Sequence, residues 1–257
     1  MTAVSVVGCG NMGGALVRGL DASGNYTLTA CDLDPDAREA VAPYTDRTTD
    51  DLAVAAEAPI VVLAVKPALA SDVLEDLELG PDQTLVSIAA GVPRALLEAH
   101  TEATVVRIMP NLAAETRSMA AAAVADGLTD EVRALLADVG EFVEVEESAM
   151  DIATAVNGSG PAFVFYCIQA MQQAGVDGGL EPDQARLLAA QTFKGAAETV
   201  LASEASLEAL IDAVCSPKGT TIEGMEVLWD SDADTAIREA VAAAERRSGE
   251  LARDVDE

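Results

Sequence analysis

Three glycines near the start of the chain are spaced for binding a dinucleotide. Gly8, Gly10 and Gly13 form a G-x-G-x-x-G motif between an apolar run at residues 4–7 and a helix-like pattern. In a strand, turn and helix of this kind, the first glycine permits the sharp turn and the second lets the backbone approach a pyrophosphate. The third lets the helix lie close to the strand. The free amides at the start of the helix then face the phosphates with the positive end of the helix dipole. An incidental glycine-rich turn is the alternative, and the strand before the motif and the helix after it disfavour that alternative.

Two residues at predicted strand ends extend this site. Asp32 follows the alternating pattern at 26–31 and comes about 20 residues after Gly13, where a carboxylate binds the ribose hydroxyls of the adenosine. Such a carboxylate repels the 2′-phosphate of NADP, so we expect NADH to be favoured over NADPH. The alternative is that Asp32 is one of many aspartates scattered over an acidic chain. Lys66 follows the apolar run at 60–65, at the sheet edge where these folds bind ligands, and its alternative is a solvated surface lysine.

Two motifs in the second half of the chain interrupt a helical pattern. Residues 157–163 read NGSGPAF, and residues 215–221 read CSPKGTT. Glycine and proline destabilise a helix interior, so the first motif predicts a break or a close backbone approach. The second places a proline, a glycine and three hydroxyl groups just before a helix, where amides and hydroxyls can bind a small anion. Either motif alone is also compatible with a plain turn between helices, but together with the nucleotide motif they indicate a substrate pocket.

The order of the predicted elements divides the chain into two domains. Strand patterns at 4–7, 26–31, 60–65, 84–88, 104–109, 120–125 and 141–145 are interspersed with helical patterns. From about residue 148 only helical stretches follow, at 163–174, 182–202, 207–214, 222–228 and 235–252. Alternating strands and helices followed by helices alone predict an α/β protein. We expect a Rossmann-type, doubly wound sheet at residues 1–147, which binds the dinucleotide, and an all-α domain at residues 148–257.

Charge is the most unusual feature of the composition. Forty-four acidic residues oppose fifteen basic ones, for a net charge of −29, and only three of the basic residues are lysines. Surfaces that are rich in acids and poor in lysine suit molar salt, where screening over about 3 Å removes their self-repulsion. We therefore expect the cytoplasm of a halophile. This charge disfavours nucleic acid as a partner, because few cations are available to neutralise phosphates.

Membrane, secretion and metal binding are not expected either. No apolar run approaches the roughly 20 residues that cross a bilayer, and we expect no signal peptide. The four cysteines have no metal-binding spacing, so we expect reduced thiols and no metal site.

Six segments together resemble pyrroline-5-carboxylate reductase. They are VVGCGNMGGAL at 6–16, AVKP at 64–67, SIAAGV at 87–92, RIMPN at 107–111, NGSGPAF at 157–163 and SPKGTT at 216–221. The resemblance runs in one register through nearly the whole chain, and its GSGPA and SP-x-GTT segments are far more specific than the glycine motif. It implies reduction of the cyclic imine 1-pyrroline-5-carboxylate to L-proline by NADH or NADPH, the last step of proline biosynthesis. It also implies a homodimer with interlocked C-terminal dimerisation domains, so that each active site draws on two chains, and leaves a higher oligomer open.

The resemblance also implies roles for individual residues. Those expected to bind the coenzyme, besides Asp32, are Gly8, Gly10, Asn11, Met12, Gly13, Val65, Lys66, Pro67 and Ala90. Those expected to bind the substrate are Glu147, Ser216, Gly219, Thr220 and Thr221. Thr221 is the expected catalytic residue, because its hydroxyl can donate to the imine nitrogen. An imine nitrogen can take its proton from a hydroxyl or from solvent, so the reaction does not require a histidine.

The chain departs from the family pattern at a few positions. Asp51 stands where the family has Asn, Asn157 replaces Ser, Phe163 replaces Tyr, and Lys218 replaces Gly. The last three lie beside matching residues, and we expect mild effects from them. The loop after Asn111 also differs, and its role stays open.

Two other functions compete with this interpretation. A β-hydroxyacid dehydrogenase shares the two-domain plan, but that family carries a catalytic lysine four residues after its GSG segment, where this chain has Val164. A binding protein that senses nucleotides without catalysis is the alternative from another class. The intact segment at 216–221 disfavours it, because a sensor needs no pocket for a second substrate.

Overall fold

The computed structural model describes the backbone of residues 1–256 and the side chains as far as residue 251. The chain forms two compact units. Unit 1 comprises Met1–Ser159 together with the C-terminal residues from Val241 onward, and unit 2 comprises Gly160–Ala240.

Unit 1 is built on an eight-stranded sheet with the order β3-β2-β1-β4-β5-β6-β7-β8. The strands are β1 (Thr2–Val7), β2 (Tyr26–Cys31), β3 (Arg47–Thr49), β4 (Ile60–Leu63), β5 (Thr84–Ser87), β6 (Thr104–Met109), β7 (Met119–Val124) and β8 (Gly140–Val145). The first six are parallel, whereas β7 is antiparallel to β6 and β8 is parallel to β7. The order reverses between β1 and β4, which is the point where a doubly wound sheet binds ligands.

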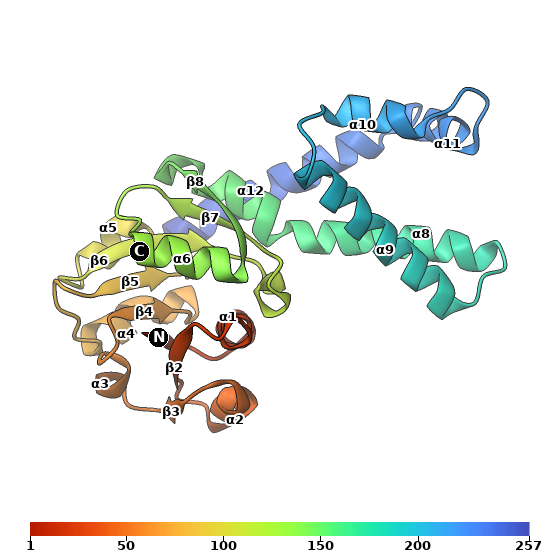
Figure 1. Cartoon of the computed structure of the whole chain (residues 1–257). Coiled ribbons are helices and arrows are strands. Elements are labelled where there is room, and N and C mark those ends of the chain that lie inside the picture. Colours follow the sequence, from red (N-terminus) through yellow and green to blue (C-terminus); the bar gives the residue numbers. More distant parts are fainter. Residues whose placement is uncertain (257) are drawn as a thin grey trace. The chain divides into compact units, whose positions relative to one another are not determined.

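Helices cover both faces of this sheet (Figure 1). One face packs against α1 (Asn11–Ser23), α2 (Pro35–Val41) and α6 (Asp130–Val139), and the other against α3 (Leu52–Ala55), α4 (Ala70–Asp76) and α5 (Arg94–Glu98). Alternate residues of β1 serve the two cores, Val4 and Val6 on the first face and Val7 on the second. Strands buried on both faces read as continuous apolar runs, which is how β4 reads in the sequence.

Unit 2 contains helices alone. They are α8 (Gly160–Asp177), α9 (Pro182–Leu201), α10 (Leu207–Val214), α11 (Thr220–Trp229) and the first turns of α12 (Ala233–Asp256). Helices α8 and α9 pack closely because small residues meet at their contact, where a β-carbon on Gly175 would lie 3.1 Å from that of Ala185.

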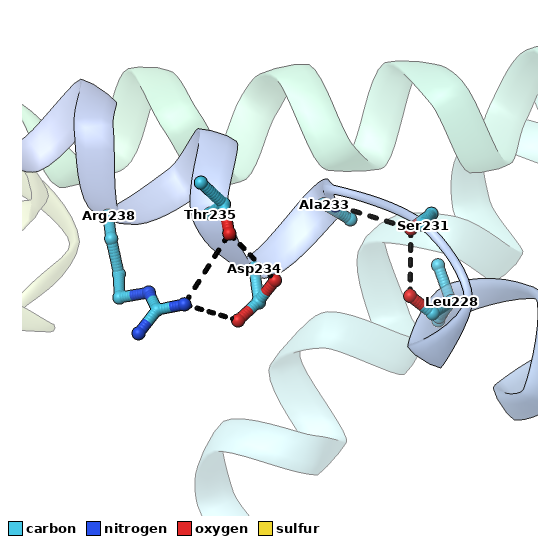
Figure 2. A network of polar contacts seen from close by, with 6 residues as sticks. All are labelled: Leu228, Ser231, Ala233, Asp234, Thr235 and Arg238. Atoms are coloured by element: carbon cyan, nitrogen blue, oxygen red, sulfur yellow. Dashed lines mark hydrogen bonds and ion pairs between the residues drawn. The ribbon is translucent and has the colours of Figure 1, made fainter.

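A short polar turn joins α11 to α12 (Figure 2). The Ser231 hydroxyl donates to the carbonyl of Leu228 at 2.7 Å and accepts from the amide of Ala233 at 3.2 Å. Arg238 then pairs with Asp234 one turn further along α12, at 2.6 Å. This pair is exposed on both sides, so we expect it to stabilise the helix by well under 1 kcal/mol.

The predicted fold class is confirmed, with a doubly wound sheet followed by helices. The predicted strands and helices are present with ends shifted by a few residues, and α10 has the predicted bounds. The sequence patterns did not predict α2, β3, α4 or α7 (Met150–Ala153). All four are seven residues long or shorter, and α2 and α4 each carry three charged side chains, so these elements show little hydrophobic periodicity.

The compact units divide the chain differently from the expected boundary between residues 147 and 148. Residues 148–159 belong with unit 1, where the side chain of Met150 is 1% exposed. The last part of α12 returns to the same unit, and the Ser248 hydroxyl donates to Asp151 at 2.7 Å. The polypeptide therefore crosses between the units twice, which hydrophobic periodicity within single helices does not reveal. None of the helices in the described residues has the length and apolarity to cross a membrane.

Candidate active site

The glycine loop between β1 and α1 has a shape that only glycine allows. Gly8 has φ of +97°, and a β-carbon there would lie 2.7 Å from the carbonyl carbon of Ala64. A β-carbon on Gly13 would lie 1.9 Å from the carbonyl oxygen of Gly8. A β-carbon on Gly10 would have no other atom within 4 Å, so the loop is open at this residue and leaves room for a ligand.

The start of α1 is suited to a negatively charged ligand. Gly10 precedes the helix without a side-chain cap, and the first turn carries no acidic residue. Neither a capping oxygen nor a carboxylate therefore competes for the amides at this end of the helix. This loop and helix start fit the pyrophosphate of a dinucleotide, the group that Gly8, Gly10, Asn11, Met12 and Gly13 are expected to bind.

Asp32 lies beside this loop at the end of β2. Its carboxylate accepts the Cys9 amide at 2.6 Å through Oδ2 and the Asp34 amide at 2.9 Å through Oδ1. These two bonds fix the carboxylate next to the glycine loop. Burial, followed by the nearby charge of Asp32, raises the pKa of the Cys9 thiol to about 12, so this cysteine stays protonated.

The other predicted coenzyme residues follow β4 and β5. Val65, Lys66 and Pro67 follow β4 after one intervening residue, and Ala90 comes three residues after the end of β5. The strand ends are tied together, since the Ala64 amide donates to Val7 at 2.7 Å and the Ile88 amide donates to Leu63 at 3.0 Å. The structure thus brings all the predicted coenzyme residues to the carboxyl edge of one sheet.

Glu147 is in unit 1, where it forms an ion pair with Arg107 of β6. The Arg107 side chain is 6% exposed and that of Glu147 is 40% exposed. A buried arginine without a partner would be strongly destabilising, so Glu147 has a structural role in addition to the predicted role in substrate binding. In the sequence, Arg107 stands out only as part of the RIMPN motif. The signal that identifies it is a charged residue within the apolar run of β6.

The motif at residues 157–163 does interrupt the helical pattern. Residues Thr154–Gly158 form a π-helical turn, and α8 starts at Gly160. Within the turn, the side-chain amide of Asn157 donates to the carbonyls of Met109 at 2.6 Å and Ala120 at 3.0 Å. The turn is therefore fastened to β6 and β7, and single π-helical turns are frequent at functional sites.

The residues predicted to bind the substrate carboxylate lie in unit 2, at the start of α11. The Gly219 amide donates to the Ser216 carbonyl at 2.9 Å, which closes a tight turn. A β-carbon on Gly219 would lie 2.3 Å from the Ser216 hydroxyl, so any larger residue there would force this hydroxyl to move. Thr220 and Thr221 are the first two residues of α11, which also lacks a side-chain cap. Amides and hydroxyls are thus gathered at the positive end of a helix, an arrangement that suits a carboxylate.

Comparisons with known proteins find matches to both parts of the chain. Residues 147–251 match the family model described as pyrroline-5-carboxylate reductase dimerisation, and residues 3–91 match one described as NADP oxidoreductase, coenzyme F420-dependent. Pyrroline-5-carboxylate reductase of Methanosarcina acetivorans is 40% identical over 263 residues, which cover 96% of this chain and 97% of that protein. The chain belongs to the pyrroline-5-carboxylate reductase family.

Solved structures of this family superimpose on most of the chain. The Plasmodium falciparum pyrroline carboxylate reductase, solved with NADP bound, is 27% identical with a TM-score of 0.86 and covers 98% of each chain. The Coxiella burnetii pyrroline-5-carboxylate reductase is 30% identical with a TM-score of 0.85 and covers 96% of this chain and 97% of its own.

The turn before α11 holds a lysine in an unusual backbone conformation. Lys218 has φ of +58°, a left-handed conformation that costs a non-glycine residue roughly 1–2 kcal/mol. Lys218 is the position where the reductase family resemblance places Gly. We expected a mild effect from this substitution, because the residues on either side of Lys218 match the family. The left-handed backbone at Lys218 makes the substitution more costly than that.

Proposed function

We propose that this chain reduces 1-pyrroline-5-carboxylate to L-proline with NADH or NADPH as the reductant. The observation that carries the proposal is the presence, in one member of the reductase family, of an open glycine loop at α1 and the SP-x-GTT turn at α11. The first suits a dinucleotide and the second suits a small carboxylate. Residues 148–257 would form the domain for substrate binding and dimerisation.

The residues divide the chemistry between them. When bound, the coenzyme supplies the hydride that reduces the carbon of the C=N bond. Ser216, Gly219 and Thr220 would hold the substrate carboxylate, and Glu147 is the acid that the resemblance places near the pocket. The Thr221 hydroxyl would donate to the ring nitrogen as that nitrogen gains its proton.

We infer that NADH is the preferred coenzyme. The Asp32 carboxylate is held by two backbone amides at the end of β2, where a 2′-phosphate would bring further negative charge. Replacing Asp32 by Ser should lower the ratio of kcat/KM for NADH over NADPH by about tenfold or more. A ratio that Asp32→Ser leaves unchanged would remove this assignment.

We infer that the protein is a homodimer with interlocked helical domains, and that such dimers can assemble into a higher oligomer. The support is the apolar surface of unit 2, where large side chains such as Leu187 at 67% and Trp229 at 56% are exposed. Surfaces of this kind mark contacts between proteins. Light scattering coupled to size-exclusion chromatography measures the state directly, and a monomer at micromolar concentration would contradict the proposal.

We infer that the protein works in the cytoplasm of a halophile. The net charge of −29 per chain doubles in a dimer. Below about 0.1 M salt the screening length exceeds roughly 10 Å, so neighbouring acids repel. Melting temperatures should rise steeply from dilute buffer to molar KCl. A melting temperature that does not change over this range would remove the argument.

The experiment that tests the reaction is a set of initial rates with pyrroline-5-carboxylate, NADH and NADPH across a KCl series. We expect turnover to proline with both coenzymes and the highest rates at high salt. NADH that binds without turnover would favour the sensor, and turnover of a β-hydroxyacid in place of the imine would favour the dehydrogenase.

A further inference from the structure

An ion pair between Arg38 and Asp50 lies at the end of β2, next to Asp32. Arg38 of α2 donates through Nη1 to the backbone carbonyl of Asp32, and its Nη2 lies 3.6 Å from Oδ2 of Asp50. Asp50 follows β3, the neighbouring strand, so this guanidinium bridges the ends of two adjacent strands. Both contacts lie where the proposed coenzyme function places the adenosine ribose, and the inference below rests on that function.

The two partners differ in how firmly they are held. The Arg38 side chain is 22% exposed, whereas that of Asp50 is 67% exposed. The bond to the Asp32 carbonyl fixes the guanidinium in place. The pair with Asp50 is solvated, so it adds little to stability. Removing the Asp50 carboxylate should therefore leave the fold intact. Arg38 would stay beside the ribose site, with the N–H groups of Nη2 free to bind another acceptor.

Carboxylates outnumber cations at this position. Asp32, Asp50 and Asp51 surround the end of β2, and Arg38 is the basic residue that pairs with one of them. The same charges affect the pKa of the Cys31 thiol. Burial first, and then these three carboxylates, raise the pKa of Cys31 to about 11, with Arg38 acting in the opposite direction.

We propose that Asp50 is a specificity-determining residue that withholds Arg38 from the coenzyme. In the native chain the guanidinium is shared between the Asp32 carbonyl and the Asp50 carboxylate, and the ribose 2′ position faces net negative charge. Without Asp50, the guanidinium is free to bind a 2′-phosphate, for which its fork of N–H donors is well matched. The chain would thus carry a 2′-phosphate ligand whose use one carboxylate suppresses.

The test compares ligands that differ only in the 2′-phosphate. Titration calorimetry in molar KCl would measure the Kd of adenosine 2′,5′-bisphosphate and of AMP for the native protein and for Asp50→Ala. We expect Asp50→Ala to bind the bisphosphate about two- to fivefold more tightly, the range that the loss of an exposed ion pair allows, with AMP unchanged. The ratio of kcat/KM for NADPH over NADH should rise by a similar factor.

Two further variants separate the guanidinium from general charge. In Asp50→Ala/Arg38→Ala the gain should disappear, and in Asp50→Ala/Arg38→Lys it should be partial, because lysine keeps the charge but lacks the fork. Asp82→Ala removes the same charge from an exposed side chain just before β5, at the opposite end of the strands. We expect it to leave the bisphosphate-to-AMP ratio unchanged.

The outcomes distinguish this inference from the proposed function. If Asp50→Ala leaves the ratio unchanged, or if the gain survives the loss of Arg38, the inference is wrong even though the imine is still reduced. An equal gain in Asp82→Ala would also overturn it, since long-range charge would then explain the effect. If the native protein binds neither AMP nor NADH, the proposed function itself fails.

Discussion

Units 1 and 2 bury their apolar side chains to very different extents. In unit 1, leucines, isoleucines and valines from every strand of the parallel part except short β3 are buried against helices on both faces. Between Gly160 and Ala240, all of which the structure describes, the buried residues are Ala185 and Ala189. The large apolar side chains of α8–α11 are instead exposed or only partly buried.

This difference indicates how each unit is stabilised. Burying a large apolar side chain contributes about 1.5–3 kcal/mol, so unit 1 has the contacts that a folded domain needs. Unit 2 forms helices but has little core of its own. It requires a second apolar surface, and the match of residues 147–251 to the family's dimerisation region indicates a second copy of the chain.

A charge placed on the apolar surface of unit 2 should disrupt its assembly. Leu187→Glu keeps good helix propensity at a residue of α9 that is 67% exposed. We expect monomers by light scattering and a loss of imine reduction by more than about hundredfold. NADH should still bind to unit 1, because its core is complete within one chain.

The matched control is Leu112→Glu, at an exposed leucine of unit 1 in the loop after Asn111. It makes the same chemical change outside unit 2, and we expect the dimer to persist. A Leu187→Glu protein that remains dimeric with native rates would show that the exposed apolar side chains of α9 are not the interface.

Thr221→Ala tests the chemical role of unit 2 without altering its assembly. The loss of a positioned proton donor should lower kcat/KM for the imine by roughly hundredfold and leave the Kd of NADH unchanged. Thr220→Ala should be milder, since the backbone amide proposed to bind the carboxylate survives the change. Native rates in Thr221→Ala would mean that water donates the proton.

The four cysteines offer a comparison of the same units by reactivity. Cys9 and Cys31 are buried in unit 1, whereas Cys167 and Cys215 are partly exposed in unit 2. The pKa values of the first two are raised to about 12 and about 11, so at pH 8–9 both stay protonated in the native state. We expect a thiol reagent to modify the unit 2 cysteines more than tenfold faster, as measured by peptide mass spectrometry.

The same shifts predict how stability depends on pH. The unfolded thiols have pKa values near 9.0, so the stabilisation is fully present below that pH and is lost as the pH rises toward 11–12. Rapid modification of Cys9 in the folded protein at pH 8 would contradict the burial of the glycine loop.

The smallest expected effect concerns Lys218. Its φ of +58° suits glycine, so Lys218→Gly should relieve strain that Lys218→Ala retains. We expect the glycine variant to melt a few degrees above the alanine variant, a difference of about 1 kcal/mol. Both variants lose the same charge, which makes each the control for the other. Equal melting temperatures would show that the turn accommodates a side chain without strain.

Local patterns in the sequence determined the parts of this protein whose cause is local. The G-x-G-x-x-G spacing, the continuous apolar run of β4 and the turn before α11 each predict their own conformation, because each depends on nearby residues. The strand ends also follow from topology, so Asp32, Lys66 and Ala90 could be placed at one sheet edge from sequence.

Only the tertiary structure decided the features that depend on residues far apart in the chain. The pairing of Arg107 with Glu147 joins positions forty residues apart, and Ser248 reaches Asp151 across ninety-seven. The bridge from Arg38 to Asp50 depends on β3, a three-residue strand with no periodic signal. The composition of α8–α11 does not reveal that their large apolar side chains are exposed. Apolar residues predict burial, but they do not show whether the surface that covers them belongs to the same chain.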